Sequence, residues 1–272
     1  MNEDYRMITR KIKMKKYRGI VFFDLDNTLL NEQHGVDDDV LAAIETLKHN
    51  QVLPVIATGR SAGVAAGVLQ TTHINSIVAL NGQYVALNGQ QVYSKSVPMP
   101  LLKRFMAYSD DHDIALSLYD AYDEWATGVN SAMKEGYSFL NMSVPTVDRQ
   151  RYETSPVYMM LALTKNKADD AVLKAKFPEF DFYRNIEFAL DVVLKGVSKQ
   201  TGISQALKAI GQTDVPTFGF GDGPNDVSLM HAVDHGVAMG NGIPETKAAA
   251  EFVSTDFREH GVVNGLKHFD LI

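Results

Sequence analysis

Short apolar runs alternate with stretches of helical periodicity over the first part of the chain. Residues 19–23 and 52–57 are almost entirely apolar and rich in β-branched or aromatic side chains, as expected of strands buried on both faces of a parallel sheet. Between them, residues 36–50 place apolar side chains at helical spacing. A helix over 61–70 and a strand over 76–80 continue the alternation. This rhythm predicts an α/β fold, a doubly wound parallel sheet with its ligand site at the carboxyl ends of the strands.

The rhythm changes in the middle of the chain, which predicts an inserted α+β domain with a mostly antiparallel sheet. Asn88-Gly89 is a dipeptide suited to the positive φ angles of a tight hairpin. We therefore expect a core of residues 19–83 and 186–272 around an insert of residues 84–185. The other predicted elements are hairpin strands over 84–87 and 91–94, helices over 101–108, 168–177, 200–210 and 227–233, and strands over 114–119, 158–164, 180–183, 217–220 and 236–239.

Composition narrows the class of protein. The 272 residues are 45% hydrophobic and 22% charged, as in ordinary globular proteins. The chain has no cysteine, which excludes disulfides, thiolate metal sites and cysteine nucleophiles and fits a reducing, cytoplasmic location. No apolar run approaches the roughly 18 residues that span a bilayer, so we expect no membrane partner.

Charge is distributed unevenly. The net charge is −7, but residues 1–18 carry seven basic and two acidic side chains, so the remainder is strongly acidic. An acidic body would repel a phosphate backbone, and we therefore expect no nucleic-acid partner. Residues 1–18 are expected to form a basic, solvated leader.

The first candidate for chemistry is Asp24-Leu25-Asp26-Asn27-Thr28, at the end of a predicted buried strand. Residues i and i+2 of a strand project to the same side, so Asp24 and Asp26 can share one crevice. Two carboxylates there repel each other unless a cation, a shared proton or differing environments stabilise them. The alternative is an acidic turn in which Asp26 caps the next segment.

A second acidic segment, Gly221-Asp222-Gly223-Pro224-Asn225-Asp226, follows another predicted strand of the same sheet. Its acids can converge on the same edge. Carboxylates without histidine or cysteine favour Mg²⁺ over zinc, and calcium is less expected because the acids come from separate strands. The alternative is a Gly/Pro turn with an aspartate helix cap.

Two further segments fit a phosphate. Lys199 begins a predicted helix, where its charge opposes the helix dipole by about 0.3–1 kcal/mol unless an anion lies nearby. Thr58-Gly59, at the end of a strand, offers a hydroxyl and backbone N–H groups for a phosphate oxygen. A solvated surface lysine and a simple strand-to-helix turn are the alternatives.

These segments, in the order Asp24-x-Asp26-x-Thr28, Thr58-Gly59-Arg60, Lys199 and Gly221-Asp222-x-x-Asn225-Asp226, resemble the motifs of the haloacid dehalogenase superfamily. Their spacing, the insert after the second motif and the tail Val237-Ala-Met-Gly-Asn241 resemble the Cof-type sugar-phosphatase-like hydrolases. The resemblance extends over nearly all of residues 19–269, and it is weakest in the insert.

The resemblance implies a role for each matching residue. Asp24 would be the nucleophile that forms an aspartyl phosphate, and Asp26 the general acid and base. Asp226 would orient Lys199 or the waters of the metal ion. Asn27 stands where the family commonly has glycine, but asparagine tolerates the left-handed backbone better than most residues. Mg²⁺ would be bound by the Asp24 carboxylate, the Asp26 carbonyl and Asp222, and the phosphoryl group by the Leu25 backbone, Thr58, Gly59, Lys199 and Asn225.

The implied function is Mg²⁺-dependent hydrolysis of small phosphorylated metabolites, with sugar phosphates favoured. The insert would be a cap that excludes water and selects the leaving group. The polar and aromatic residues 119–125 could face a sugar, or could pack the core of the cap. A sugar phosphomutase, a phospho-accepting signalling module and a non-catalytic binding protein remain as alternatives. The sequence identifies neither the substrate nor a protein partner.

Overall fold

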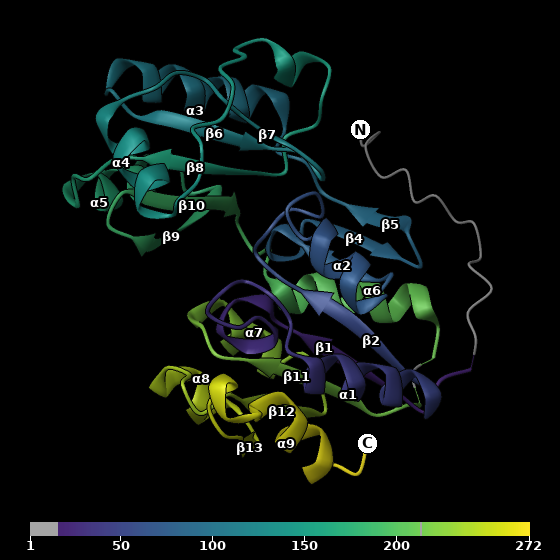
Figure 1. The fold of residues 1–272 in the computed structure, drawn as a ribbon. Coiled ribbons are helices and arrows are strands. Elements are labelled where there is room, and N and C mark those ends of the chain that lie inside the picture. The colour runs from purple at the N-terminus through teal and green to yellow at the C-terminus, as the bar shows by residue number, and fades with distance from the viewer. Residues whose placement is uncertain (1–15, 213) are drawn as a thin grey trace. The chain divides into compact units, whose positions relative to one another are not determined.

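The computed structural model describes residues 16–212 and 214–272 of the chain, so residues 1–15 of the expected basic leader lie outside the described residues. The chain divides into two compact units (Figure 1). Unit 1 contains the chain up to Ser94 and from Ser198 onward, and unit 2 is Lys95–Val197.

Unit 1 is built around an eight-stranded sheet of order β13-β12-β11-β1-β2-β3-β4-β5. Its strands are β1 (Gly19–Phe23), β2 (Val52–Ala57), β3 (Ile77–Ala79), β4 (Tyr84–Leu87), β5 (Gln90–Ser94), β11 (Thr217–Gly221), β12 (His235–Ala238) and β13 (Phe252–Val253). The strands from β13 to β3 run parallel, and β4 and β5 add an antiparallel edge. The predicted α/β fold with a parallel-dominated sheet is confirmed.

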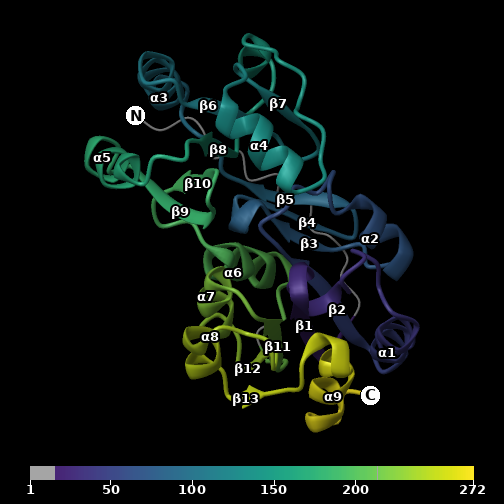
Figure 2. The ribbon, with the colours of Figure 1, turned by 60° about the vertical axis from the view of Figure 1, so that its left-hand side comes forward.

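Helices cover both faces of this sheet, because β1 is apolar at every position and is buried throughout. The helices are α1 (Asp38–His49), α2 (Ala66–Thr72), α6 (Lys199–Ile210), α7 (Val227–Met230), α8 (Pro244–Ala249) and α9 (Gly261–His268). Ile20 and Phe22 share one core cluster with residues of α6 and α7. Figure 2 shows α1 and α9, which contact each other, on the opposite side. Because the covered strands from β13 to β3 run parallel, their carboxyl ends lie at the same edge of the sheet.

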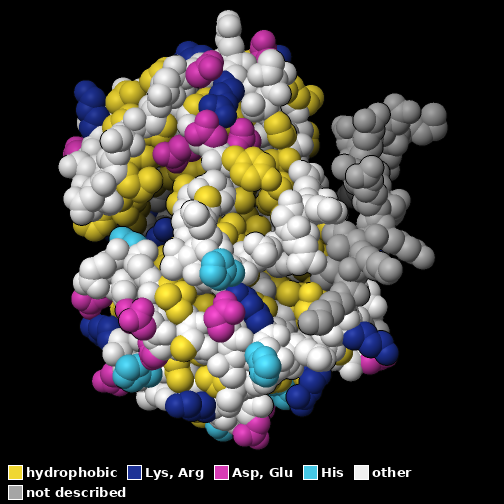
Figure 3. All heavy atoms as spheres, turned by 45° about the vertical axis from the view of Figure 1, so that its right-hand side comes forward, with side chains coloured by type: hydrophobic (Ala, Val, Ile, Leu, Met, Phe, Trp, Pro, Cys, Tyr) yellow, Lys and Arg dark blue, Asp and Glu magenta, His cyan; other side chains and the backbone are white. Residues whose placement is uncertain are grey.

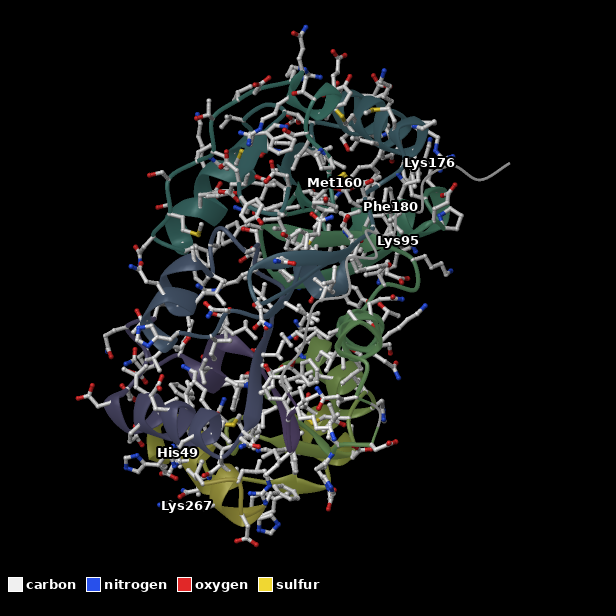
Figure 4. All side chains as sticks on the ribbon, turned by 90° about the vertical axis from the view of Figure 1, so that its right-hand side faces the viewer. His49, Lys95, Met160, Lys176, Phe180 and Lys267 are labelled. Atoms are coloured by element: carbon white, nitrogen blue, oxygen red, sulfur yellow. The ribbon has the colours of Figure 1, made fainter. Side chains whose placement is uncertain are left out.

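Unit 2 contains a five-stranded antiparallel sheet of order β7-β6-β8-β10-β9. Its elements are α3 (Met99–Asp111), β6 (Ala115–Tyr119), β7 (Glu124–Ala126), α4 (Ser131–Phe139), β8 (Met159–Leu163), α5 (Ala168–Lys176), β9 (Phe180–Ile186) and β10 (Ala189–Leu194). Met160 and Phe180 lie in one core cluster with residues of α3 and α5 (Figure 4). Trp125 is buried in the same cluster, and Tyr119 is buried as well, whereas Tyr122 is 65% exposed. Of the two alternatives given for residues 119–125, packing inside unit 2 therefore describes Trp125 and Tyr119.

Several boundaries differ from those expected from the sequence. The hairpin of β4 and β5 extends the sheet of unit 1, and β9 and β10 belong to the sheet of unit 2, so both unit boundaries fall later in the chain than 84 and 185. The helix expected from residue 61 begins at Ala66, because the Ser61 hydroxyl accepts the N–H of Val64 and forms a turn. Strands β7, β10 and β13 and helices α4, α8 and α9 were not predicted.

The surface carries charges of both signs. Acidic and basic side chains are interspersed on the face that Figure 3 displays. Among residues 16–212 and 214–272, every helix is too short or too polar to cross a bilayer.

Candidate active site

Four charged residues from separate parts of the chain meet at the carboxyl edge of the unit 1 sheet. Strands β1 and β11 are parallel neighbours with Phe23 opposite Phe220, so the residues that follow them lie side by side. The backbone N–H of Asp24 donates to the Phe220 carbonyl at 2.9 Å. Asp24 is only 6% exposed, because it continues a strand that is buried on both faces.

Lys199 joins the two acidic segments. Its Nζ donates to Asp24 Oδ1 at 2.5 Å and to Asp226 Oδ1 at 2.6 Å, and both Lys199 and Asp226 are fully buried. The lysine is the first residue of α6, and Ser198 caps that helix in a capping box with Thr201. A cation at the start of a helix is unfavourable, and the two carboxylates offset this cost. The anion that the sequence analysis expected near Lys199 is therefore provided by Asp24 and Asp226.

Asp226 is held from the other side by backbone groups. Its Oδ2 accepts the N–H of Asp222 at 3.0 Å and the N–H of Gly223 at 2.9 Å. Gly221 has to be glycine here, since a Cβ at that position would lie 2.4 Å from the Asp226 carboxyl carbon. The loop therefore fixes Asp226 in the orientation that contacts Lys199.

Asp24, Asp222 and Asp226 form a group of three carboxyl groups whose oxygens lie within 4.8 Å of one another. We call these three residues together with Lys199 the carboxylate cluster. Asp222 is oriented by the Thr28 hydroxyl, which donates to its Oδ1 at 2.9 Å.

The electrostatics of the carboxylate cluster favour an additional cation. Burial, reinforced by the charge of Asp226, raises the pKa of Asp222 to about 6 and raises the pKa of Asp24 well above its usual range. Burial alone would lower the pKa of Lys199, but the charges of Asp226 and Asp24 outweigh it, so its pKa is raised and it stays protonated. The carboxylate oxygens of this group are hard ligands that could hold a metal ion.

Asp26 has a different environment from Asp24. The chain leaves the strand geometry after Phe23 and forms a turn over Leu25–Leu29, so the strict i, i+2 alternation does not continue. The Asp26 side chain is 47% exposed and pairs with both nitrogens of the Arg60 fork. Asp26 still lies near enough to Asp222 for its charge to contribute to the raised pKa of Asp222.

The turn after Asp26 uses a left-handed residue. Asn27 has φ 56°, which confirms that asparagine takes the conformation that glycine would favour here. The Asn241 side-chain amide, in the tail motif, donates to the Asn27 carbonyl at 2.9 Å. The tail thus supports the loop that carries Asp26.

A second group of candidate residues meets through Asn81. Gly59 follows Thr58 at the end of β2, and a Cβ on Gly59 would lie 3.3 Å from Asn81 Oδ1. Asn225 Nδ2 donates to that same oxygen at 3.1 Å. The structure therefore brings together Thr58–Gly59 and Asn225, both expected to bind phosphate, on either side of Asn81.

The sequence interpretation missed the contacts of Arg60, Asn81 and Asn241. Arg60 and Asn241 stand inside quoted motifs, which was the available signal, and Asn81 directly follows the predicted strand over 76–80. Their partners lie 34, 144 and 214 positions away in the chain, so only the fold reveals the contacts.

Comparisons with known proteins identify the family of the chain. A family model for haloacid dehalogenase-like hydrolases matches residues 21–266. The protein named "Putative phosphatase YkrA" from Bacillus subtilis (strain 168) is 29% identical over 255 residues, which cover 93% of this chain and 98% of that protein.

Two solved structures share the fold over nearly the whole chain. A hypothetical protein from Geobacillus kaustophilus HTA426 is 32% identical with a TM-score of 0.88, covering 94% of this chain and 100% of the other. The HAD subclass IIB sugar phosphatase BT4131 is 26% identical with a TM-score of 0.80, covering 93% and 99%. The resemblance drawn from the motifs is confirmed. The chain belongs to the haloacid dehalogenase-like hydrolases, and within them it is an enzyme of the phosphatase class.

Proposed function

We propose that this protein is a Mg²⁺-dependent phosphatase that hydrolyses small phosphorylated metabolites through an aspartyl phosphate on Asp24. The observation that carries the proposal is the carboxylate cluster, in which a buried nucleophile candidate contacts a buried Lys199 at 2.5 Å. An anionic carboxylate can approach a phosphate dianion only where positive charge offsets their repulsion.

Mg²⁺ is the ion that fits the donor set. The Asp24 carboxylate, the Asp26 backbone carbonyl and Asp222 would bind it, and Asp226 would orient Lys199. When bound, the ion would supply positive charge opposite the phosphoryl oxygens. The raised pKa values of Asp24 and Asp222 support this assignment, because burial and the nearby charge of Asp226 disfavour their ionised forms, which a bound cation would stabilise.

The chain's own residues divide the reaction into two steps. Asp24 attacks phosphorus, its oxygen forms a new bond to phosphorus as the ester bond breaks, and Asp26 gives a proton to the departing oxygen. Asp26 then takes a proton from the water that attacks the aspartyl phosphate, which releases phosphate and restores Asp24. The Leu25 backbone, Thr58, Gly59, Lys199 and Asn225 hold the phosphoryl group during both steps.

Sugar phosphates are the favoured substrate class, and this choice rests on the likeness to a sugar phosphatase of subclass IIB. We assign to unit 2 the role of a cap that excludes water and selects the leaving group. The absence of cysteine fits action in the reducing cytoplasm on soluble metabolites.

The test is phosphate release from a panel of sugar phosphates and from 4-nitrophenyl phosphate, with Mg²⁺ and with chelator. The proposal predicts turnover that requires Mg²⁺ and that falls by at least about 10⁴-fold in Asp24→Asn. Turnover that is unaffected by the chelator or by Asp24→Asn would contradict it. An isomerised sugar phosphate without free phosphate would instead identify a phosphomutase.

A further inference from the structure

The contact between Arg60 and Asp26 is a two-point contact. Arg60 Nε donates to Asp26 Oδ2 at 2.9 Å, and Arg60 Nη2 donates to Asp26 Oδ1. Two neighbouring donors of the guanidinium each contact a different carboxyl oxygen, so the guanidinium fixes the plane of the carboxyl group as well as its position, and each oxygen keeps a lone pair for other partners. The Asp26 side chain is 47% exposed, and without such a partner it could sample several rotamers.

The backbone of Arg60 is fixed at both of its polar groups. Its N–H donates to the Thr58 hydroxyl at 3.1 Å, and its carbonyl accepts the N–H of Leu80 at 3.0 Å. Leu80 and Asn81 both have φ 52°, a left-handed conformation that residues other than glycine seldom adopt and that defines a turn here. The guanidinium therefore extends from a rigid position beside the proposed phosphate-binding residues Thr58 and Gly59.

The backbone on the other side of the contact is fixed as well. Asn27, the residue after Asp26, is left-handed, and its carbonyl accepts the Asn241 amide at 2.9 Å. With both chain segments held, the pair differs from an exposed ion pair between two mobile side chains, which contributes little.

We propose that Arg60 is the positioning residue for Asp26, the group that aims the Asp26 carboxyl at the departing oxygen of the substrate. This inference rests on the proposed function. The proton moves from Asp26 to the ester oxygen as the phosphorus–oxygen bond breaks, and Arg60 keeps all its protons throughout. Proton transfer requires a hydrogen-bonding distance of about 2.6–3.2 Å, so the aim of the carboxyl group limits the rate.

The role predicts that the need for Arg60 depends on the leaving group. Phenolate is a poor leaving group that needs a proton, whereas 2,4-dinitrophenolate departs without one. The value of kcat/KM reports only the steps up to departure of the leaving group. We expect Arg60→Gln to lower kcat/KM for phenyl phosphate by about tenfold or more, and for 2,4-dinitrophenyl phosphate by less than about twofold.

Three further variants connect this effect to Asp26. Asp26→Asn should show the same dependence on the leaving group, and the double variant should be no worse than Asp26→Asn alone. Arg60→Lys keeps the charge but loses the fork, so it should recover only part of the rate. Arg104→Gln, which breaks an ion pair with Glu179 inside unit 2, is the matched control and should leave the ratio of the two substrates unchanged.

Other outcomes would overturn the assignment. Equal losses with both substrates would show that Arg60 acts on the phosphoryl group or on the fold, and unchanged or faster cleavage of phenyl phosphate would show that it does not support proton transfer. Additive losses in the double variant would separate Arg60 from Asp26. A wild-type protein that is inactive on both esters with Mg²⁺ present would contradict the proposed function, and the assignment of Arg60 with it.

Discussion

Each unit contains a cluster of polar side chains that are buried or partly buried, and the polar groups of the two clusters are paired in different ways. In unit 1, the lysine of the carboxylate cluster contacts Asp24 and Asp226, and Asp222 lies beside these two acids. In unit 2, Tyr137 OH lies 2.7 Å from the Ser117 hydroxyl, 3.5 Å from Tyr119 OH and 3.4 Å from Glu124 Oε2. We call these four residues the tyrosine cluster.

Hydroxyl groups both donate and accept, so the hydroxyls of Tyr137, Ser117 and Tyr119 can hydrogen-bond to one another while Tyr137 also donates to Glu124. Burial raises the pKa of Tyr137 to about 12 and also raises the pKa of Glu124, so both groups retain their protons more strongly. The carboxylate cluster has only acceptors apart from Lys199, and it carries more negative charge than that lysine balances. The comparison indicates that the tyrosine cluster serves the stability of unit 2, whereas the carboxylate cluster is organised to receive charge.

The largest expected effect comes from removing the cation of the carboxylate cluster. Lys199→Met leaves Asp24 and Asp226 facing each other without a counter-charge. We expect the free energy of unfolding, measured by urea denaturation at neutral pH without Mg²⁺, to fall by about 3–5 kcal/mol. Lys48→Met, which breaks a surface pair with Glu45, should cost less than about 1 kcal/mol. Equal losses of unfolding free energy in the two variants would show that the buried lysine of the carboxylate cluster matters no more to stability than a lysine in a surface ion pair.

Asp222→Asn should raise the free energy of unfolding of the metal-free protein, whereas Lys199→Met lowers it. The shift of its pKa from 3.8 to about 6 means that ionised Asp222 destabilises the metal-free fold. Asparagine keeps an oxygen for the Thr28 hydroxyl and removes the charge. We expect the metal-free variant to be more stable than wild type by about 1–2 kcal/mol at pH 7.5, after allowance for partial exposure. The variant should also lose the increase in melting temperature that Mg²⁺ gives to the wild type.

The sign of this effect fixes its pH window. An acid with a raised pKa binds more protons in the folded state, so its contribution to stability falls as pH rises. The advantage of Asp222→Asn over wild type should therefore be absent below about pH 4, grow up to about pH 6 and stay constant above it. An advantage that shrinks as pH rises would contradict the assigned shift.

The smallest effect is expected in the tyrosine cluster. Tyr137→Phe removes one hydroxyl from the tyrosine cluster, which should lower the free energy of unfolding by about 1 kcal/mol. Its melting temperature should respond to Mg²⁺ as the wild type does, because no metal ligand has changed. Tyr122→Phe, at a side chain that is 65% exposed, is the control and should lower the free energy of unfolding by less than Tyr137→Phe does. A Tyr137→Phe protein that no longer responds to Mg²⁺ would show that the two clusters are not independent.

The sequence predicted the sheet of unit 1 more successfully than unit 2, for a physical reason. Strand β1 is apolar at every position and buried on both faces, so its pattern is unambiguous. Strand β10 contains Asp191 between apolar residues, and β7 has only three residues, so neither gives a clear period. Helix α4 begins at Ser131 after Asn130, whose side chain accepts the N–H of Met133. Asn130 was not used as a helix start in the sequence analysis.

For the site, the sequence placed Asp24 and the Gly221–Asp226 loop at one edge, because parallel strands end together, whereas Lys199 was added through the family resemblance. The partner of Asp26 could not be predicted in this way. Arg60 lies 34 positions away in the chain, and its carbonyl accepts a hydrogen bond from Leu80, in a left-handed turn with Asn81. Such turns leave a weak pattern in the sequence, since neither Leu80 nor Asn81 is glycine.

The central claim is tested most directly by trapping the phosphoryl group on the enzyme. Wild-type protein is mixed with Mg²⁺ and 2,4-dinitrophenyl phosphate, quenched in acid within the first turnover, and digested for mass spectrometry. The account predicts one phosphoryl group on Asp24, and none on the corresponding peptide of Asp24→Asn. A phosphoryl group on another residue, or phosphate release from an Asp24→Asn protein at the wild-type rate, would contradict it.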